Sequence, residues 1–216
     1  MTPRLRVALA KGRLYEPSVE RFAAAGAAPA ANPGRRLLVP SSDPAIEFLV
    51  VKPGDVPVYV ESGAADLGIT GTDVLRESGA DVLEPLELGF GFCRLVVAAP
   101  SGSPYPALPG GITARVATKY PRLAHDHFAA LGRPVDIIQV NGSVEVAPLL
   151  NLSHWIVDLV DTGNTLRANG LVERETILQC GAILVANRAS QKLKLDAYLD
   201  LMERLERAAA SAPARA

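Results

Sequence analysis

Cysteine and histidine are both scarce in this chain of 216 residues, which contains two cysteines and three histidines. Cys93 and Cys180 lie in apolar surroundings, a pattern that excludes a disulfide framework and a cysteine-rich metal cluster and indicates reduced core thiols. His125 and His127 flank Asp126 in a predicted helix with no third ligand nearby, so we expect solvated side chains there rather than a metal site. The residues that would hold any metal are left open by the sequence.

A strong charge of either sign is missing as well, because 22 lysines and arginines stand against 23 aspartates and glutamates, giving a net charge of −1. This balance excludes nucleic acid and an anionic membrane surface as the main partner, so any phosphate-binding charge must be local. No apolar run approaches the roughly 18 residues that a membrane span requires. The apolar stretch before Lys11 is too short for a secretion signal, and a cytoplasmic protein is expected.

What the chain does contain is a regular alternation of short β-branched runs and helical patterns, which predicts an α/β protein with mostly parallel sheets. Composition shifts most strongly in the proline- and glycine-rich residues 100–111, where we place the crossing between two lobes. The first lobe is predicted to comprise residues 1–99 together with 181–207, and the second residues 100–180. Residues 208–216 are small and polar, as in a frayed tail.

The periodicities predict the following elements. Strands are expected at residues 5–10, 37–40, 46–51, 66–70, 83–88, 93–99, 113–117, 135–140, 155–160 and 176–186. Helices are expected at residues 15–25, 56–62, from 71 onward, 120–131, 144–149, 166–169 and 195–205. The last strand and the last helix are expected to return to the first lobe.

The segment from Trp155 to Leu171 combines a strand, a polar turn and a helical turn. The turn, Asp161-Thr162-Gly163-Asn164-Thr165, offers two hydroxyls, a glycine suited to positive φ, and backbone amides outside regular structure, which together suit a phosphate dianion. A helical turn from Leu166 to Asn169 would place its positive N-terminal end at that dianion. An ordinary loop with an Asx turn explains the same residues without a ligand.

A second candidate anion site lies near the start of the chain. Lys11, Gly12 and Arg13 follow the strand predicted for residues 5–10. Ligands of α/β sheets bind at this end of a strand, so the two cations are placed to contact a phosphate. A solvated basic turn is the alternative.

Two further positions are candidates for contacting a nucleotide or phosphate. Gly71 and Thr72 form another corner between a strand and a helix, although Thr72 or Asp73 then has the alternative role of capping that helix. Arg94 interrupts an apolar strand, so it either extends along the surface to solvent or points into an anion site.

Three blocks, in one order, resemble the ATP phosphoribosyltransferase family of histidine biosynthesis. They are Ala10-Lys11-Gly12-Arg13-Leu14; Val58-Tyr59-Val60-Glu61-Ser62-Gly63-Ala64-Ala65-Asp66-Leu67-Gly68-Ile69-Thr70-Gly71-Thr72-Asp73-Val74-Leu75; and the segment from Val140 to Asn187, with Asn141-Gly142-Ser143-Val144-Glu145-Val146-Ala147-Pro148, Ile156-Val157-Asp158-Leu159-Val160, Thr162-Gly163-Asn164-Thr165-Leu166 and Ala168-Asn169-Gly170-Leu171. Three separated blocks are more specific than any single loop. The resemblance extends to about Arg204.

This resemblance implies the fold of type II periplasmic binding proteins and the transfer of a phosphoribosyl group from phosphoribosyl pyrophosphate to N1 of ATP, with release of pyrophosphate. The turn at Asp161–Thr165 would bind the 5-phosphate. Glu145 or Asp158 would contact ribose hydroxyls. Mg²⁺ on the pyrophosphate, with Lys11 and Arg13, would neutralise the leaving group.

The resemblance also carries expectations about partners. The long form of the family has a further C-terminal domain that binds histidine, and this sequence ends shortly after its last predicted helix. The short form is therefore expected, as a homodimer within a hetero-oligomer that contains a regulatory subunit related to histidyl-tRNA synthetase.

Two positions depart from the family pattern. Lys52 stands where many members have arginine, and Asn151-Leu152-Ser153-His154 stands where Gly-Leu-Ala-Asp is common. His154 keeps open the alternative of a regulatory protein without activity. A solute-binding protein of the same fold is a second alternative, although the chain lacks a recognisable secretion signal.

Overall fold

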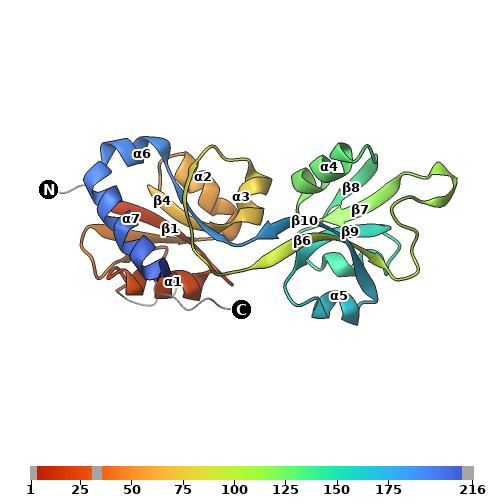
Figure 1. Cartoon of the computed structure of the whole chain (residues 1–216), viewed down its shortest axis with the longest axis horizontal. Coiled ribbons are helices and arrows are strands. Elements are labelled where there is room, and N and C mark those ends of the chain that lie inside the picture. The colour runs from red at the N-terminus through yellow and green to blue at the C-terminus, as the bar shows by residue number, and fades with distance from the viewer. Residues whose placement is uncertain (1–3, 31–35, 211–216) are drawn as a thin grey trace. The chain divides into compact units, whose positions relative to one another are not determined.

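Two separate sheets organise the chain in the computed structural model, which describes residues 4–30 and 36–210. The first unit comprises the residues up to Gly91 and those from Gly181 onward, and the second unit runs from Phe92 to Cys180 (Figure 1). The predicted first crossing, after residue 99, is therefore wrong. The strand that begins at Cys93 already belongs to the second unit, so the proline-rich stretch follows that strand instead of marking the boundary.

The elements of the first unit are β1 (Leu5–Ala10), α1 (Tyr15–Ala24), β2 (Leu38–Pro40), β3 (Ile46–Val51), the 3-10 turn η1 (Pro53–Asp55), α2 (Val56–Glu61), β4 (Leu67–Gly71), α3 (Thr72–Ser78), β5 (Leu83–Glu87), β11 (Ala182–Ala186), α6 (Arg188–Leu193) and α7 (Leu195–Ala210). Those of the second unit are β6 (Cys93–Pro100), η2 (Pro109–Gly111), β7 (Ala114–Thr118), α4 (Pro121–Ala130), β8 (Val135–Gln139), η3 (Val144–Val146), β9 (Trp155–Val160), α5 (Asn164–Ala168) and β10 (Leu171–Cys180).

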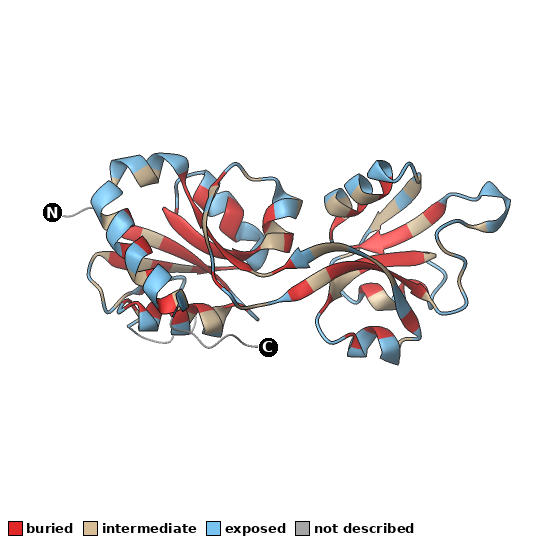
Figure 2. Ribbon diagram, viewed as in Figure 1, coloured by how far each residue is buried: buried red, intermediate tan, exposed pale blue. Residues whose placement is uncertain are grey.

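The first sheet has the strand order β2-β3-β1-β4-β11-β5, with helices on both faces. Alternate residues of β1 point to opposite faces, as the pleat requires. Val7 and Leu9 pack with α1 and α7, whereas Ala8 and Ala10 pack with α2 and α3. The inner strands β3, β1, β4 and β11 are largely buried, while the outer faces of the helices are exposed (Figure 2).

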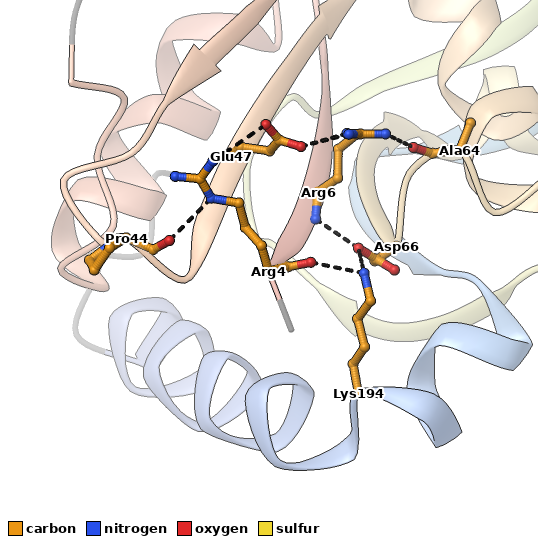
Figure 3. A network of polar contacts seen from close by, with 7 residues as sticks. All are labelled: Arg4, Arg6, Pro44, Glu47, Ala64, Asp66 and Lys194. Atoms are coloured by element: carbon orange, nitrogen blue, oxygen red, sulfur yellow. Dashed lines mark hydrogen bonds and ion pairs between the residues drawn. The ribbon is translucent and has the colours of Figure 1, made fainter. Parts of the chain in front are cut away.

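A polar network fixes the junction between α6 and α7 to the first sheet (Figure 3). Asp66, which is only 5% exposed, accepts hydrogen bonds from Arg6 N and from Lys194 Nζ, each at 2.7 Å. Lys194 Nζ also donates to Arg4 O at 2.8 Å, and the Arg6 guanidinium pairs with Glu47 at 2.7 Å. The chain segment that returns to this unit is thus held by a largely buried carboxylate.

The second sheet has the order β10-β6-β9-β7-β8 and also separates two cores. On one face, Phe128 of α4 packs with Trp155 of β9. On the other face, Val144 of η3 and Leu166 of α5 pack with Ile156. Helix α4 and the turn that precedes α5 therefore lie on opposite sides of this sheet.

Three predicted features of the fold are wrong in detail. The sheets are mixed, because four of the nine strand pairings within the described residues are parallel and five are antiparallel. The strand predicted for residues 176–186 is two strands, β10 and β11, which break at Gly181 and join different sheets. The helix predicted for residues 144–149 is only the short 3-10 turn η3.

Two other expectations concern the end of the chain and its surroundings. Residues 208–210 are the last turn of α7, not part of a frayed tail, and residues 211–216 lie outside the described residues. Within the described part of the chain, no helix combines the length and the apolar character needed to cross a membrane.

Candidate active site

The candidate phosphate site of the second unit lies where three parallel strands end. Strands β8, β7 and β9 pair in parallel, so their carboxyl ends meet at one edge of the sheet. Lys119 follows β7, Glu145 follows β8, and the turn at Asp161 follows β9. Sheets of this kind bind ligands at such an edge.

The predicted phosphate turn has an open, polar geometry. Asp161, Thr162, Asn164 and Thr165 are exposed, whereas Gly163 is buried and has φ +77°. Helix α5 begins at Asn164, two residues earlier than predicted, and is only five residues long. A helix this short adds little dipole, so the anion-binding capacity of the turn rests on its amides and hydroxyls.

Two arginines hold the carbonyl groups at the start of this turn. Arg94 Nη1 donates to Asp161 O at 2.9 Å, and Arg167 Nη2 donates to Thr162 O at 3.1 Å. Arg94 also forms a bidentate pair with Glu173 of β10, one contact of which is 3.0 Å between Nε and Oε2. This hydrogen-bonded pairing raises the pKa of the Arg94 guanidinium above its usual value. In the structure the Arg94 guanidinium contacts protein acceptors, and its predicted contact with a nucleotide or phosphate stays a prediction.

Asp158 lies close enough to Glu145 to feel its negative charge. Burial raises the pKa of the Asp158 carboxyl, and the negative charge of Glu145 adds to that effect. A hydrogen bond from Leu159 N, 2.8 Å from Oδ1, and the charge of Lys119 act in the opposite direction. The site therefore presents two carboxylates and one cation beside the phosphate turn, a set that suits sugar hydroxyls.

The first unit has a comparable edge. Strands β3, β1 and β4 are parallel neighbours; Lys52 and Lys11 follow the carboxyl ends of the first two, and the third ends at Gly71. Lys11 N donates to Val51 O at 2.8 Å, which joins the first two ends directly. The exposed side chains of Lys11 and Lys52 therefore supply positive charge to one edge.

The residues after Lys11 shape the start of α1. Gly12 has φ +90°, and its carbonyl accepts a hydrogen bond from Tyr15 N at 3.0 Å. Arg13 is exposed and donates through Nη2 to Gly91 O at 3.3 Å. Arg13 is thus already in contact with the last residue of the first stretch of this unit.

Gly71 and Thr72 have structural contacts at their predicted site. Thr72 exchanges two hydrogen bonds with Gly181: Thr72 N donates to Gly181 O at 3.0 Å, and Thr72 Oγ1 accepts from Gly181 N at 3.1 Å. A Cβ atom at Gly71 would lie 2.2 Å from Asp73 Oδ1, so a larger residue would displace that carboxylate. The N-cap residue of α3 is Gly71, which has no side chain to offer, and a capping role for Asp73 stays a prediction.

The two histidines of α4 differ in their surroundings. Across residues 4–30 and 36–210, no three histidine, cysteine, aspartate or glutamate side chains gather as a metal site. His125 is exposed, but the prediction of a solvated His127 is wrong, because its Nε2 lies 2.9 Å from Glu175 Oε2. Arg133 Nη1 donates to the same carboxylate at 2.7 Å.

His154 lies far from the phosphate turn. Its Nδ1 accepts a hydrogen bond from Arg115 N at 3.0 Å, and its own N donates to Arg115 O at 2.9 Å. It precedes β9, whereas the phosphate turn follows that strand, and a six-residue strand is roughly 20 Å long. This departure from the family pattern therefore gives no reason to doubt the site.

Three residues near the phosphate turn of the second unit, Lys119, Arg167 and Glu173, were not predicted from the sequence. Lys119 follows a predicted strand and was accessible to the same argument that selected Lys11. Arg167 and Glu173 had no such signal, because an arginine on a short helix and a glutamate on an exposed strand are ordinary surface residues.

The fold and the two strand-end sites define an α/β protein built like the type II periplasmic binding proteins. The periplasmic aliphatic sulphonate binding protein SsuA from Escherichia coli is similar with a TM-score of 0.59, covering 97% of this chain and 74% of that chain, at 16% identity. At this identity the likeness concerns the fold alone. It confirms the predicted fold class.

Similarity in sequence is much more specific. The family model described as "HisG: ATP phosphoribosyltransferase" matches residues 52–207, and the chain belongs to this family. An ATP phosphoribosyltransferase from Sorangium cellulosum is 50% identical, with 98% of this chain and 99% of the relative covered. One from Burkholderia thailandensis is 47% identical, with 96% and 97% covered.

A solved structure agrees with this assignment. The "ATP phosphoribosyl transferase (HisG:HisZ) complex from Thermotoga maritima" is similar with a TM-score of 0.84 and 33% identity, covering 95% of this chain and 97% of that chain. The resemblance predicted from the three sequence blocks is confirmed. The protein is an enzyme of the pentosyltransferase class, and the two alternatives without catalysis are not favoured.

Proposed function

We propose that this chain transfers the phosphoribosyl group of phosphoribosyl pyrophosphate to N1 of ATP, the first step of histidine biosynthesis, and that the turn at Asp161–Thr165 binds the 5-phosphate. The observation that carries the assignment of the site is the position of this turn, within the residues that the family model matches and at the carboxyl end of β9. Gly163 at φ +77° and the exposed Thr162 and Thr165 suit a small dianion.

The reaction is a displacement at C1 of the ribose through an oxocarbenium-like state, so positioning and charge neutralisation matter more than a covalent nucleophile. Asp158 and Glu145 would accept hydrogen bonds from ribose hydroxyls. On the first unit, Lys11 and Arg13 carry charge suited to the departing pyrophosphate, and the backbone at Gly12 and Gly71 together with the hydroxyl of Thr72 would contact the nucleotide phosphates.

Mg²⁺ is proposed as the metal of the reaction, carried by the pyrophosphate group. The described residues fit this arrangement, because Mg²⁺ commonly uses one or two carboxylates together with substrate phosphates and needs no cage of three protein ligands. The ion supplies charge neutralisation for the leaving group. Asp158 and Glu145 are the carboxylates beside the phosphate turn of the second unit that could bind the Mg²⁺ ion.

We also propose that the chain works in the cytoplasm, as a homodimer within a hetero-oligomer that includes a regulatory subunit related to histidyl-tRNA synthetase. The similar Thermotoga maritima structure is a HisG:HisZ complex, which supports a partner of this kind.

The direct test supplies ATP, phosphoribosyl pyrophosphate and Mg²⁺ to the chain with its synthetase-like partner. Phosphoribosyl-ATP and pyrophosphate are expected in equal amounts by chromatography. Pyrophosphate release without phosphoribosyl-ATP would show hydrolysis instead of transfer. Binding of both substrates without any product would favour a regulatory or solute-binding protein.

A further inference from the structure

We propose that Arg94 and Glu173, together with Arg167, position the phosphate turn and do not themselves touch the phosphoribosyl group. This inference rests on the function proposed above, since it concerns how the same turn receives its ligand. It changes the role expected for Arg94, which was predicted to contact a nucleotide or phosphate.

Three of the five N–H donors of Arg94 are directed at protein acceptors. Its Nε and Nη2 donate to the two carboxylate oxygens of Glu173, and its Nη1 donates to Asp161 O at 2.9 Å. A bidentate pair of this kind fixes the plane of the guanidinium as well as its position. Nη1 is thereby held at one place beside the turn.

Arg167 acts on the next carbonyl of the same turn. Its Nη2 donates to Thr162 O at 3.1 Å and to Asn164 Oδ1 at 2.5 Å. Two successive carbonyl groups, those of Asp161 and Thr162, are therefore each bound by a guanidinium.

The planarity of the peptide bond fixes the direction of the N–H groups that follow these two carbonyls. In a planar trans peptide unit, the carbonyl of one residue and the N–H of the next point in opposite directions. Because the carbonyls of Asp161 and Thr162 are turned toward the arginines, the N–H groups of Thr162 and Gly163 are turned away from them. The two arginines thus present two amides for an anion without approaching it.

Gly163 allows the turn to lie close to these side chains. A Cβ atom at this position would be 3.1 Å from Arg167 Nη1 and 3.5 Å from Glu173 Oε1. A side chain would push against both groups, and the positive φ would be strained in addition. The turn and its supporting residues therefore form one packed set.

The effect of Glu173→Gln separates this role from direct contact. If Arg94 bound the phosphate, Glu173 would compete with it, so loss of that negative charge should tighten the binding of phosphoribosyl pyrophosphate. If Arg94 positions the turn, the variant loses the charged bidentate contact that fixes the guanidinium, and the affinity should fall by about 3- to 10-fold.

The measurement is calorimetric titration of phosphoribosyl pyrophosphate with Mg²⁺ into the complex of the full chain with its partner subunit, in the wild type, Glu173→Gln and Arg94→Lys. Arg94→Lys keeps the charge but not the planar fork, so it should weaken binding to a similar extent. The double variant should be no weaker than the worse single one, because both changes disrupt one unit. The affinity for ATP should stay within about twofold in all variants.

Asp126→Asn is the matched control, because it removes one negative charge on the opposite face of the same sheet. It should leave the affinity for phosphoribosyl pyrophosphate unchanged. Tighter or equal binding by Glu173→Gln, additive losses in the double variant, or a parallel loss of ATP binding would each overturn the positioning role. Failure of the wild type to bind phosphoribosyl pyrophosphate would instead overturn the proposed function.

Discussion

At the scale of single residues, burial of the Asp158 carboxylate beside the phosphate turn should lower the free energy of unfolding. Burial raises the pKa of this carboxyl, so the native state holds the proton more tightly than the unfolded chain does. Stability therefore falls as pH rises from the unfolded-state pKa through the raised native pKa, and the cost is fully present above that native pKa.

Asp158→Asn should accordingly be more stable than the wild type at pH 7, since an amide can still accept the hydrogen bond from Leu159 N. The difference should shrink as the pH falls toward about 4, where the unfolded carboxyl also becomes protonated. Urea denaturation at several pH values measures this. An advantage that is independent of pH would assign the gain to packing and not to charge.

Arg13 is expected to act on the leaving group. A cation that faces the departing pyrophosphate is worth most when negative charge gathers there, so Arg13→Ala should lower kcat and weaken inhibition by pyrophosphate. Steady-state kinetics in both directions, with the partner subunit present, would show this. Wild-type kinetics in this variant would favour the alternative that Lys11, Gly12 and Arg13 form only a solvated basic turn.

At the scale of elements, the attachment of α6 and α7 to the first sheet should depend on Asp66. Asp66→Ala removes an acceptor for Arg6 N and Lys194 Nζ in a nearly buried position, so it should lower the free energy of unfolding by about 2–3 kcal/mol. Asp81→Ala breaks the Arg188–Asp81 ion pair of the same unit, where Asp81 is 74% exposed, and should cost less than about 1 kcal/mol. Equal losses in urea denaturation would contradict the role of the buried network.

Most elements follow from local patterns, but their partners in space do not. The runs that form β1, β4 and β9 have the predicted bounds to within a residue or so, because their apolar patterns are strong. Gly181 separates two strands within the run that was predicted as one strand, and nothing in that run tells which sheet each half will join. The parallel or antiparallel sense of a pairing likewise depends on distant segments.

In the candidate site, too, local features could be predicted from the sequence and contacts between distant residues could not. Gly163 and its neighbouring hydroxyls were found because their chemistry is local to one turn. The role of Arg94 was not, because it depends on Glu173, which is 79 residues away in the sequence. A long-range ion pair of this kind leaves no periodic signal.

At the scale of the whole molecule, histidine sensing is expected to reside in the partner. We predict that the chain alone is insensitive to histidine and has little activity, and that the synthetase-like subunit confers both high activity and inhibition. If inhibition acts through affinity, histidine and the substrates must oppose each other's binding in the complex to the same extent. Titration of histidine against the chain alone is decisive here, since strong inhibition without a partner would contradict the short-form assignment.

The central claim is that the turn at Asp161–Thr165 binds the 5-phosphate, and Thr165→Val tests it most directly. Valine keeps the size of threonine and removes only the hydroxyl, at an exposed position outside both cores of the second unit. Loss of one hydrogen bond to a charged group costs about 1.5–3 kcal/mol, which corresponds to a roughly 10- to 150-fold weaker Kd. Calorimetric titration of phosphoribosyl pyrophosphate should show this loss with an unchanged midpoint of thermal unfolding, whereas wild-type affinity in the folded variant would contradict the assignment.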